Sequence, residues 1–252
     1  MKYNLSWLTH KFDSGESIEY IFFWGHAAKH GESIGKFIFS QWYPSAFIVD
    51  GITYKTAEHW MMAQKASLFD EPDIFNKIIA SDKPGEVKAL GRAIRNFDEL
   101  QWDKWKYDIV RTGSIHKFHQ NKTLRDYLLA TGDKVIVEAS PSDFIWGIGL
   151  SQDEKMVENP YVWRGTNLLG FALMEARDFL RSMGEFGYIS GFLPPWKKFP
   201  GINPTDMFWR MGTGEDYIIQ YSKYFLSLSE REKAIYKLSY PAPNGDWAGY
   251  YE

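Results

Sequence analysis

Two side chains of opposite formal charge, Glu58 and Lys65, stand seven positions apart in the segment TAEHWMMAQK. If this segment is an α-helix, about 100° of rotation per residue brings both side chains to within about 20° of one azimuth. Apolar side chains, Met61 and Met62 among them, flank that azimuth on both sides. The pair is therefore predicted in the middle of an apolar face, where a solvated helix does not place charges.

The chemistry of such a pair has two interpretations. A lysine among apolar side chains has a lowered pKa and can act as an amine nucleophile, while a nearby carboxyl transfers protons or stabilises a cation. Alternatively, Glu58 complements the positive end of a helix that begins after Thr56, and Lys65 extends its amine to solvent. The helix pattern alone leaves both open.

The elements that must position this pair are mostly helices. Periodicity and Pro/Gly punctuation predict helices at residues 57–68, 71–80, 84–94, 101–119 and 122–130. The segment TNLLGFALMEARDFLRSMG predicts a further helix, with Thr166 as N-cap, Gly170 as a close packing point and Gly184 just past its end.

Short antiparallel strands are predicted in the first fifty residues, where aromatic and polar residues alternate in YIFFWG, GKFIFSQWYP and AFIVDGITY. Asp50 and Gly51 form a two-residue hairpin signal between two of these strands. The segment DKVIVEAS predicts another strand, and DFIWGIG a Gly-bearing turn after it. The predicted fold class is α+β, a compact helix-rich domain with short antiparallel strands.

This main domain is predicted at residues 1–184, followed by an aromatic-rich C-terminal extension at residues 185–252 that is a lid or a decoration, or part of the same domain. Gly, Pro and aromatic residues open the extension as irregular or hairpin-like chain. Two helices follow, at about 213–227 and 230–238, and the second has the capping box SERE. The extension's rings, Trp196, Phe208 and Trp209 among them, can cover the site, stack on single-stranded nucleic acid or pack on the main domain.

Composition limits the classes of function. Of 252 residues, 44% are hydrophobic and 24% charged, as in a folded globular protein. The net charge of -3 argues against a general basic field for nucleic acid or anionic lipid, so any nucleic-acid contact must be local. The chain has no Cys, which excludes disulfides and thiol nucleophiles, and no run of about twenty apolar residues that a membrane span requires. We therefore predict a cytoplasmic protein that does not enter a membrane; its oligomeric state is left open.

Two histidine pairs, in HAAKH and HKFH, have spacings that permit zinc. No third ligand stands nearby in the sequence, and no His-Glu-x-x-His motif occurs. Neither a metal nor a cofactor is predicted.

Four stretches, in order, resemble the motifs of the NADAR (NAD- and ADP-ribose-associated) family. They are FSQWYPSAFIVDGITYKTAEHWMMAQKASLF, KALGRAIRNFD with its following Trp, LLATGDKVIVEASPSDFIWGIGL and WRGTNLLGFALMEARDFL, and the resemblance runs from about Tyr20 to Leu180. It implies a helix-rich α+β fold and an N-glycosidase that removes ADP-ribose from ADP-ribosylated guanine bases in DNA or RNA. The alternatives are cleavage of ribosyl-aminopyrimidine phosphates of riboflavin synthesis, and an ADP-ribose or NAD binding module without turnover.

Carried across on these motifs, the predicted catalytic residues are Glu58, Lys65 and Asp143. Glu58 assists proton transfer and stabilises positive charge on the anomeric carbon. Lys65 either attacks that carbon to form an imine, or acts electrostatically on phosphate while Glu58 or Asp143 activates water. For Asp143, a turn-forming role in SPSD is the alternative.

The residues predicted to bind substrate are Trp42, Tyr43, Arg92, Trp146, Gly147, Arg164 and Asn167. Their rings can stack on a base, glycine allows close backbone approach, and the arginines and the amide can receive phosphate. Core packing and helix capping are the alternatives. The sequence also departs from the family: FSQWYP stands where members often have FSNFYP, and Ile148 stands where some have Asp, which puts any role of that Asp in doubt.

Overall fold

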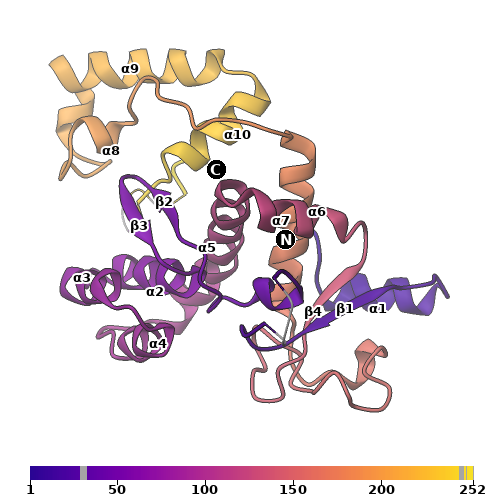
Figure 1. Cartoon of the computed structure of the whole chain (residues 1–252). Helices are drawn as coiled ribbons and strands as arrows, with labels where there is room; N and C mark the ends of the chain where they lie inside the picture. The colour runs from indigo at the N-terminus through magenta and orange to yellow at the C-terminus, as the bar shows by residue number, and fades with distance from the viewer. Residues whose placement is uncertain (29–32, 244–246, 248, 252) are drawn as a thin grey trace.

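The computed structural model describes residues 1–28, 33–243, 247 and 249–251. In the described residues the chain forms helices and two separate sheets of two strands each, which confirms the predicted α+β class (Figure 1). The helices are α1 (Leu5–Asp13), α2 (Ala57–Leu68), α3 (Pro72–Ala80), α4 (Pro84–Arg92), α5 (Glu99–Gln120), α6 (Lys122–Ala130), α7 (Leu168–Met183), α8 (Pro195–Lys198), α9 (Gly212–Ser227) and α10 (Glu230–Ser239). The strands are β1 (Tyr20–Phe23), β2 (Phe47–Val49), β3 (Ile52–Tyr54) and β4 (Val135–Glu138).

The β2–β3 hairpin confirms the predicted turn. Asp50 (φ 56°) and Gly51 (φ 76°) both adopt the left-handed conformation that a two-residue hairpin turn requires. The strand β1 was predicted as antiparallel, and that is wrong: it pairs in parallel with β4, with Tyr20 opposite Val135. Local alternation cannot reveal a partner more than a hundred positions away.

Two further corrections concern the first forty residues. The segment GKFIFS contains a 3-10 helix at Lys36–Phe39 instead of a strand, and its consecutive residues Phe37, Ile38 and Phe39 are all buried, so no alternating face exists. The helix α1 was not predicted. It begins at Asn4, whose side chain accepts a hydrogen bond from the Trp7 backbone N–H.

The core is centred on α5, which packs against α2 on one side and α7 on the other (Figure 1). Gly113 of α5 leaves room for the Trp60 ring of α2, since a Cβ there would lie 2.3 Å from Trp60 Cδ1. Gly170 of α7 confirms the predicted close packing: a Cβ would lie 2.1 Å from the Ile136 carbonyl oxygen of β4. Backbone therefore touches backbone where α7 covers β4.

The N-cap of α7 is Asn167, with φ 53°, and not the predicted Thr166. The Thr166 hydroxyl instead donates to the Ile145 carbonyl at 2.7 Å. The Thr166 hydroxyl is hydrogen-bonded to the preceding loop, so it does not cap the helix.

The extension begins by packing on α5, where the Phe186 ring stacks on His119 at 3.8 Å and the Tyr188 hydroxyl bonds to His116 Nδ1 at 2.8 Å. The predicted capping box at Ser229 and Glu232 is present at the start of α10. Trp196 and Trp209 pack in a second apolar cluster, which also holds Trp247. The boundary near residue 184 stays a prediction. In the described part of the chain, no helix is long and apolar enough to cross a membrane.

Candidate active site

Glu58 lies in the first turn of α2, and its backbone N–H donates to the Gln41 carbonyl at 2.9 Å. Only 3% of the residue is exposed. Burial raises the pKa of this carboxyl to about 7, against the opposing effects of Lys88, the hydrogen-bonding Trp42 side chain and Arg92. Its Oε1 is buried and has no hydrogen-bond partner among the described residues.

Glu138 is the last residue of β4, and it was not predicted as a site residue from the sequence. Burial raises the pKa of its carboxyl to about 8, with further increases from the charges of Asp143 and Glu58, while Lys88 opposes them. Its Oε2 is buried and, within the described residues, has no hydrogen-bond partner. The sequence shows an acid directly after the apolar run Val135–Val137. Only the parallel pairing with β1 places this acid at the strand end where open α/β sheets bind ligands.

Asp143 fulfils the turn-forming alternative. Its Oδ1 accepts hydrogen bonds from the backbone N–H groups of Ile145 (2.9 Å) and Trp146 (2.8 Å). Its negative charge also raises the pKa of both Glu58 and Glu138. Asp143 thus builds the loop after β4 and favours the protonated form of the two glutamic acids.

Glu58, Glu138 and Asp143 together form what we call the acidic group. Two cations of α4 face it. Lys88 lowers the pKa of both Glu58 and Glu138, and Arg92 lowers that of Glu58. They stand four positions apart on one face of α4. Arg92 was predicted from the sequence and Lys88 was not, although the spacing in KALGR predicts that the two side chains point the same way.

Trp42 connects the acids to the cations. Its side chain donates a hydrogen bond to Glu58, and its ring centroid lies 6.0 Å from Lys88 Nζ and 5.7 Å from the His26 ring. The neighbouring Tyr43 instead packs against Phe37 at 5.6 Å, which matches its core-packing alternative.

The loop that carries Trp42 is tied to α5 by a buried lysine. Lys117 is 1% exposed, and its Nζ donates to the carbonyls of Ile38 (2.6 Å) and Ser40 (2.9 Å). Burial lowers the pKa of Lys117 to about 7. Two hydrogen bonds from this ammonium therefore fix the chain just before Trp42.

Lys65 does not contact the acidic group. Its Nζ donates to the Gly91 carbonyl at 3.0 Å and lies 4.2 Å from the Phe97 ring centroid and 5.5 Å from that of Trp102. Burial lowers its pKa. Seven residues of α2 place Lys65 about 10 Å from Glu58 along the helix axis. The shared azimuth was inferred correctly, but the two charges are separated along the helix.

Two of the remaining predicted residues, Asn167 and Gly147, pack against the end of β4. Asn167 is fully buried, and its side chain bridges β4 by accepting from Glu138 N (3.0 Å) and donating to the Ile136 carbonyl (3.0 Å). This amide is hydrogen-bonded within the protein, and its role toward phosphate stays a prediction. A Cβ on Gly147 would lie 2.8 Å from the Glu138 carbonyl oxygen, so glycine is needed for packing there.

Trp146 is half-buried, and its carbonyl accepts from Leu169 N at 3.1 Å. Arg164 is exposed, and its backbone N–H donates to the Ile148 carbonyl at 2.9 Å. Neither side chain is linked to the acidic group by a described interaction.

The histidine pair His116 and His119 lies among aromatic side chains. Among the described residues, no three His, Cys, Asp or Glu side chains are grouped to hold a metal ion. His116 and His119 contact the rings of Tyr188 and Phe186, and His30 lies outside the described residues.

Residues 22–181 match the sequence model of the NADAR domain. An N-glycosidase of Acanthamoeba polyphaga mimivirus is 46% identical over 168 residues, covering 65% of this chain and 97% of that protein. A riboflavin biosynthesis protein of Vibrio vulnificus is 27% identical over 169 residues, covering 67% of this chain and 41% of that protein.

The NMR structure of the E. coli protein YbiA has a similar fold, with a TM-score of 0.53 and 26% identity, over 69% of this chain and 94% of that one. The matched segment contains Glu58, Lys88, Glu138 and Asp143. It also contains α2, α4, α5, β4 and most of α7, the elements that build the acidic group. The chain belongs to the NADAR family.

Proposed function

We propose that this protein is an N-glycosidase that hydrolyses the bond between ADP-ribose and a guanine base in nucleic acid. The observation that carries the proposal is the pair of buried carboxyls, Glu58 and Glu138, each with one oxygen that has no partner in the described residues. A relative named N-glycosidase that is 46% identical supports the reaction type. Two carboxyl groups, one protonated and one ionised, are the usual catalytic groups for glycosidic cleavage.

The proposed chemistry assigns one proton transfer to each acid. Cleavage leaves positive charge on the anomeric carbon, and the departing base needs a proton. Glu138, with a pKa of about 8, is protonated at neutral pH and donates to the base. Glu58, with a pKa of about 7, stabilises the cation in its ionised form and accepts a proton from the water that attacks the anomeric carbon. The C–N bond is replaced by a C–O bond, and solvent exchange returns both acids to their starting states.

The proposed substrate contacts use the groups around this pair. Lys88 and Arg92 supply positive charge suited to the diphosphate, and the half-buried Trp42 offers a ring for stacking. A local basic pair of this kind is compatible with a chain whose net charge is -3.

A second candidate reaction is hydrolysis of a ribosyl-aminopyrimidine phosphate. The naming of a 27% identical relative as a riboflavin biosynthesis protein favours it. This substrate also joins a base, a ribose and a phosphate, so the same acids and cations serve both reactions. A binding module for ADP-ribose or NAD is the third candidate, and two buried carboxyls, each with one oxygen that has no hydrogen-bond partner in the described residues, argue against it because binding an anion does not require them.

Mass spectrometry of reaction products tests the proposal. The protein is mixed separately with ADP-ribosylated guanine in a short DNA strand and with a ribosyl-aminopyrimidine phosphate. We expect release of ADP-ribose and restoration of guanine by the parent protein, and no release by Glu58→Gln. Cleavage of the second substrate alone would establish the second candidate, and calorimetric binding of ADP-ribose without any cleavage would establish the binding module.

For Lys65 we expect no covalent intermediate. Its amine donates a hydrogen bond to the Gly91 carbonyl and shows no interaction with Glu58, which supports direct attack by water. Borohydride added during turnover, followed by peptide mass spectrometry, should therefore find no ribose adduct on Lys65. An adduct on Lys65 that disappears in Glu58→Gln would establish the imine route instead.

A further inference from the structure

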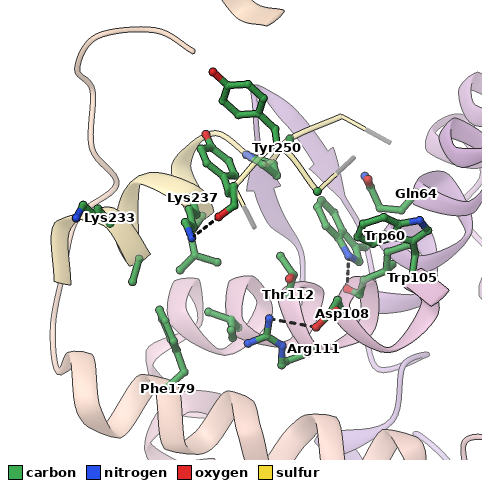
Figure 2. A pocket seen from close by; sticks show the side chains of 18 of the residues that line it. Trp60, Gln64, Trp105, Asp108, Arg111, Thr112, Phe179, Lys233, Lys237 and Tyr250 are labelled. Carbon is green, nitrogen blue, oxygen red and sulfur yellow. Dashed lines mark hydrogen bonds and ion pairs between the residues drawn. The ribbon is translucent and has the colours of Figure 1, made fainter. Parts of the chain in front are cut away.

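A cleft of about 430 Å³ lies between the main domain and the extension (Figure 2). Its floor is α5, with Trp60 and Gln64 of α2 at one end, and its roof is α10 together with residues that follow α10. Neither Glu58 nor Glu138 lines it. The volume lies within the range of about 300 to 1,000 Å³ that is usual for small-molecule sites. This cleft is separate from the acidic group and exists only because the extension covers α5.

Among the polar groups of the cleft are Arg111 and Thr112 on the floor and Lys237 in the roof (Figure 2). Arg111 Nε is buried without a hydrogen bond in the described structure, but it lies 3.9 Å from Glu175 Oε2, and Nη2 lies 3.2 Å from Asp108 Oδ1. Lys237 Nζ donates to the Tyr251 carbonyl at 3.2 Å. Within the described residues, Lys237 has no carboxylate at ion-pair distance, so its ammonium keeps donors for another acceptor.

The charge of the lining is positive in sum. Arg111, Lys233 and Lys237 are its cations, and Asp108 and Glu230 are its acids. Lys233 is paired with Glu230 at 2.7 Å, and that acid is 90% exposed at the rim. Arg111 is paired with Asp108 at 3.2 Å. The positive charge that remains uncompensated for a ligand therefore lies on Lys237, and Arg111 adds guanidinium N–H groups from the opposite wall.

The apolar part of the lining is aromatic. Trp60, Trp105, Phe179 and Tyr250 contribute rings to the cleft (Figure 2). The Trp60 indole N–H is already bonded to the Ile109 carbonyl at 2.8 Å, so this side chain offers only its ring. Such walls bind a planar ring, and they do so next to two cations and a hydroxyl.

We propose that the cleft binds a small aromatic phosphate monoester, with its ring beside Trp60, Trp105 and Tyr250. The phosphate lies between Arg111 and Lys237, where the guanidinium and the ammonium donate charge-assisted hydrogen bonds from two sides and Thr112 adds a hydroxyl. This site is independent of the proposed N-glycosidase reaction.

Calorimetry on the full chain with AMP, adenosine and ribose 5-phosphate as probes tests the proposal. AMP carries both the ring and the phosphate, and we expect it to bind at least about tenfold more tightly than either of the other two. Binding of adenosine as tight as that of AMP would overturn the phosphate part of the proposal. Absence of AMP binding would overturn the whole.

Substitutions locate the bound AMP. Lys237→Gln should weaken AMP binding at least about tenfold, the usual loss for a charge-assisted hydrogen bond. Thr112→Val, which keeps the shape of the side chain, should weaken it less. Lys223→Gln, at an exposed lysine of α9, is the matched control and should leave it unchanged. If Lys88→Gln abolishes binding while Lys237→Gln and Thr112→Val do not, AMP occupies the acidic group and the cleft proposal fails. Thermal melting of each variant verifies folding.

Discussion

Replacing Glu138 with glutamine is expected to lower kcat for the proposed N-glycosidic cleavage by about 100- to 10,000-fold, the usual contribution of a positioned general acid. Glutamine retains the shape of the side chain but has no proton to transfer. In the parent, kcat should rise with pH as the Glu58 carboxyl, with a pKa of about 7, ionises. It should fall as the Glu138 carboxyl, with a pKa of about 8, loses its proton. Initial rates at saturating substrate across pH 5 to about 10 measure both limbs.

The matched control is Glu19→Gln, at an exposed acid just before β1 that pairs with Lys134 at 3.4 Å. A surface ion pair of this kind contributes about 0 to 1 kcal/mol to stability, so the rate should be nearly unchanged. The decisive observation is the alkaline limb. If Glu138→Gln still loses activity above pH 8 as the parent does, another group is the acid and our assignment is wrong.

Gly170→Ala is expected to reduce the free energy of unfolding by about 3 kcal/mol, the upper end of the usual cost of overpacking. The added Cβ would lie 2.1 Å from the Ile136 carbonyl oxygen and 2.5 Å from Asn167 Nδ2. The first of these is backbone, so the clash cannot be relieved by rotating a side chain. The helix α7 must move away from β4, and Asn167, which holds the Glu138 backbone, moves with it. Urea denaturation followed by circular dichroism measures the loss.

Gly187→Ala is the control for this substitution, because a Cβ there would meet nothing within 4 Å and the backbone is not left-handed. Its stability should equal that of the parent or exceed it slightly, since alanine restricts the unfolded chain. Equal stability of Gly170→Ala and Gly187→Ala would show that α7 and β4 tolerate separation.

The sequence predicted those features that local chemistry decides. Thr56 caps α2, the Asp50-Gly51 turn joins β2 to β3, and the capping box starts α10, each within about four residues of chain. The features that were missed depend on distant partners. The parallel pairing of β1 with β4 is one, and the burial of Glu138 among groups from α2 and α4 is another.

The charged residues of the candidate site show the same difference between local features and features that depend on distant contacts. Glu58 was identified because its own helix places it among apolar side chains, and the structure buries it. Lys65 lies on the same side of α2 as Glu58 but about two turns further along the helix axis. Helix periodicity predicts the side of the helix and does not show what each side chain contacts. Lys88 was overlooked because nothing within KALGR reveals that α4 packs so that this amine faces the acids.

The parallel pairing of β1 with β4 also bears on the order of folding. Ribosomes release the N-terminal part of a chain first, so β1 and Glu58 are free of the ribosome well before β4 and Glu138. Pairings of such large sequence separation form slowly, because the entropy of closing a long loop is lost before the new contacts stabilise the chain. Until then both carboxyls remain hydrated and ionise near pH 4, the range of ordinary glutamic acids. The acid catalysis that we propose at neutral pH therefore requires completion of the fold.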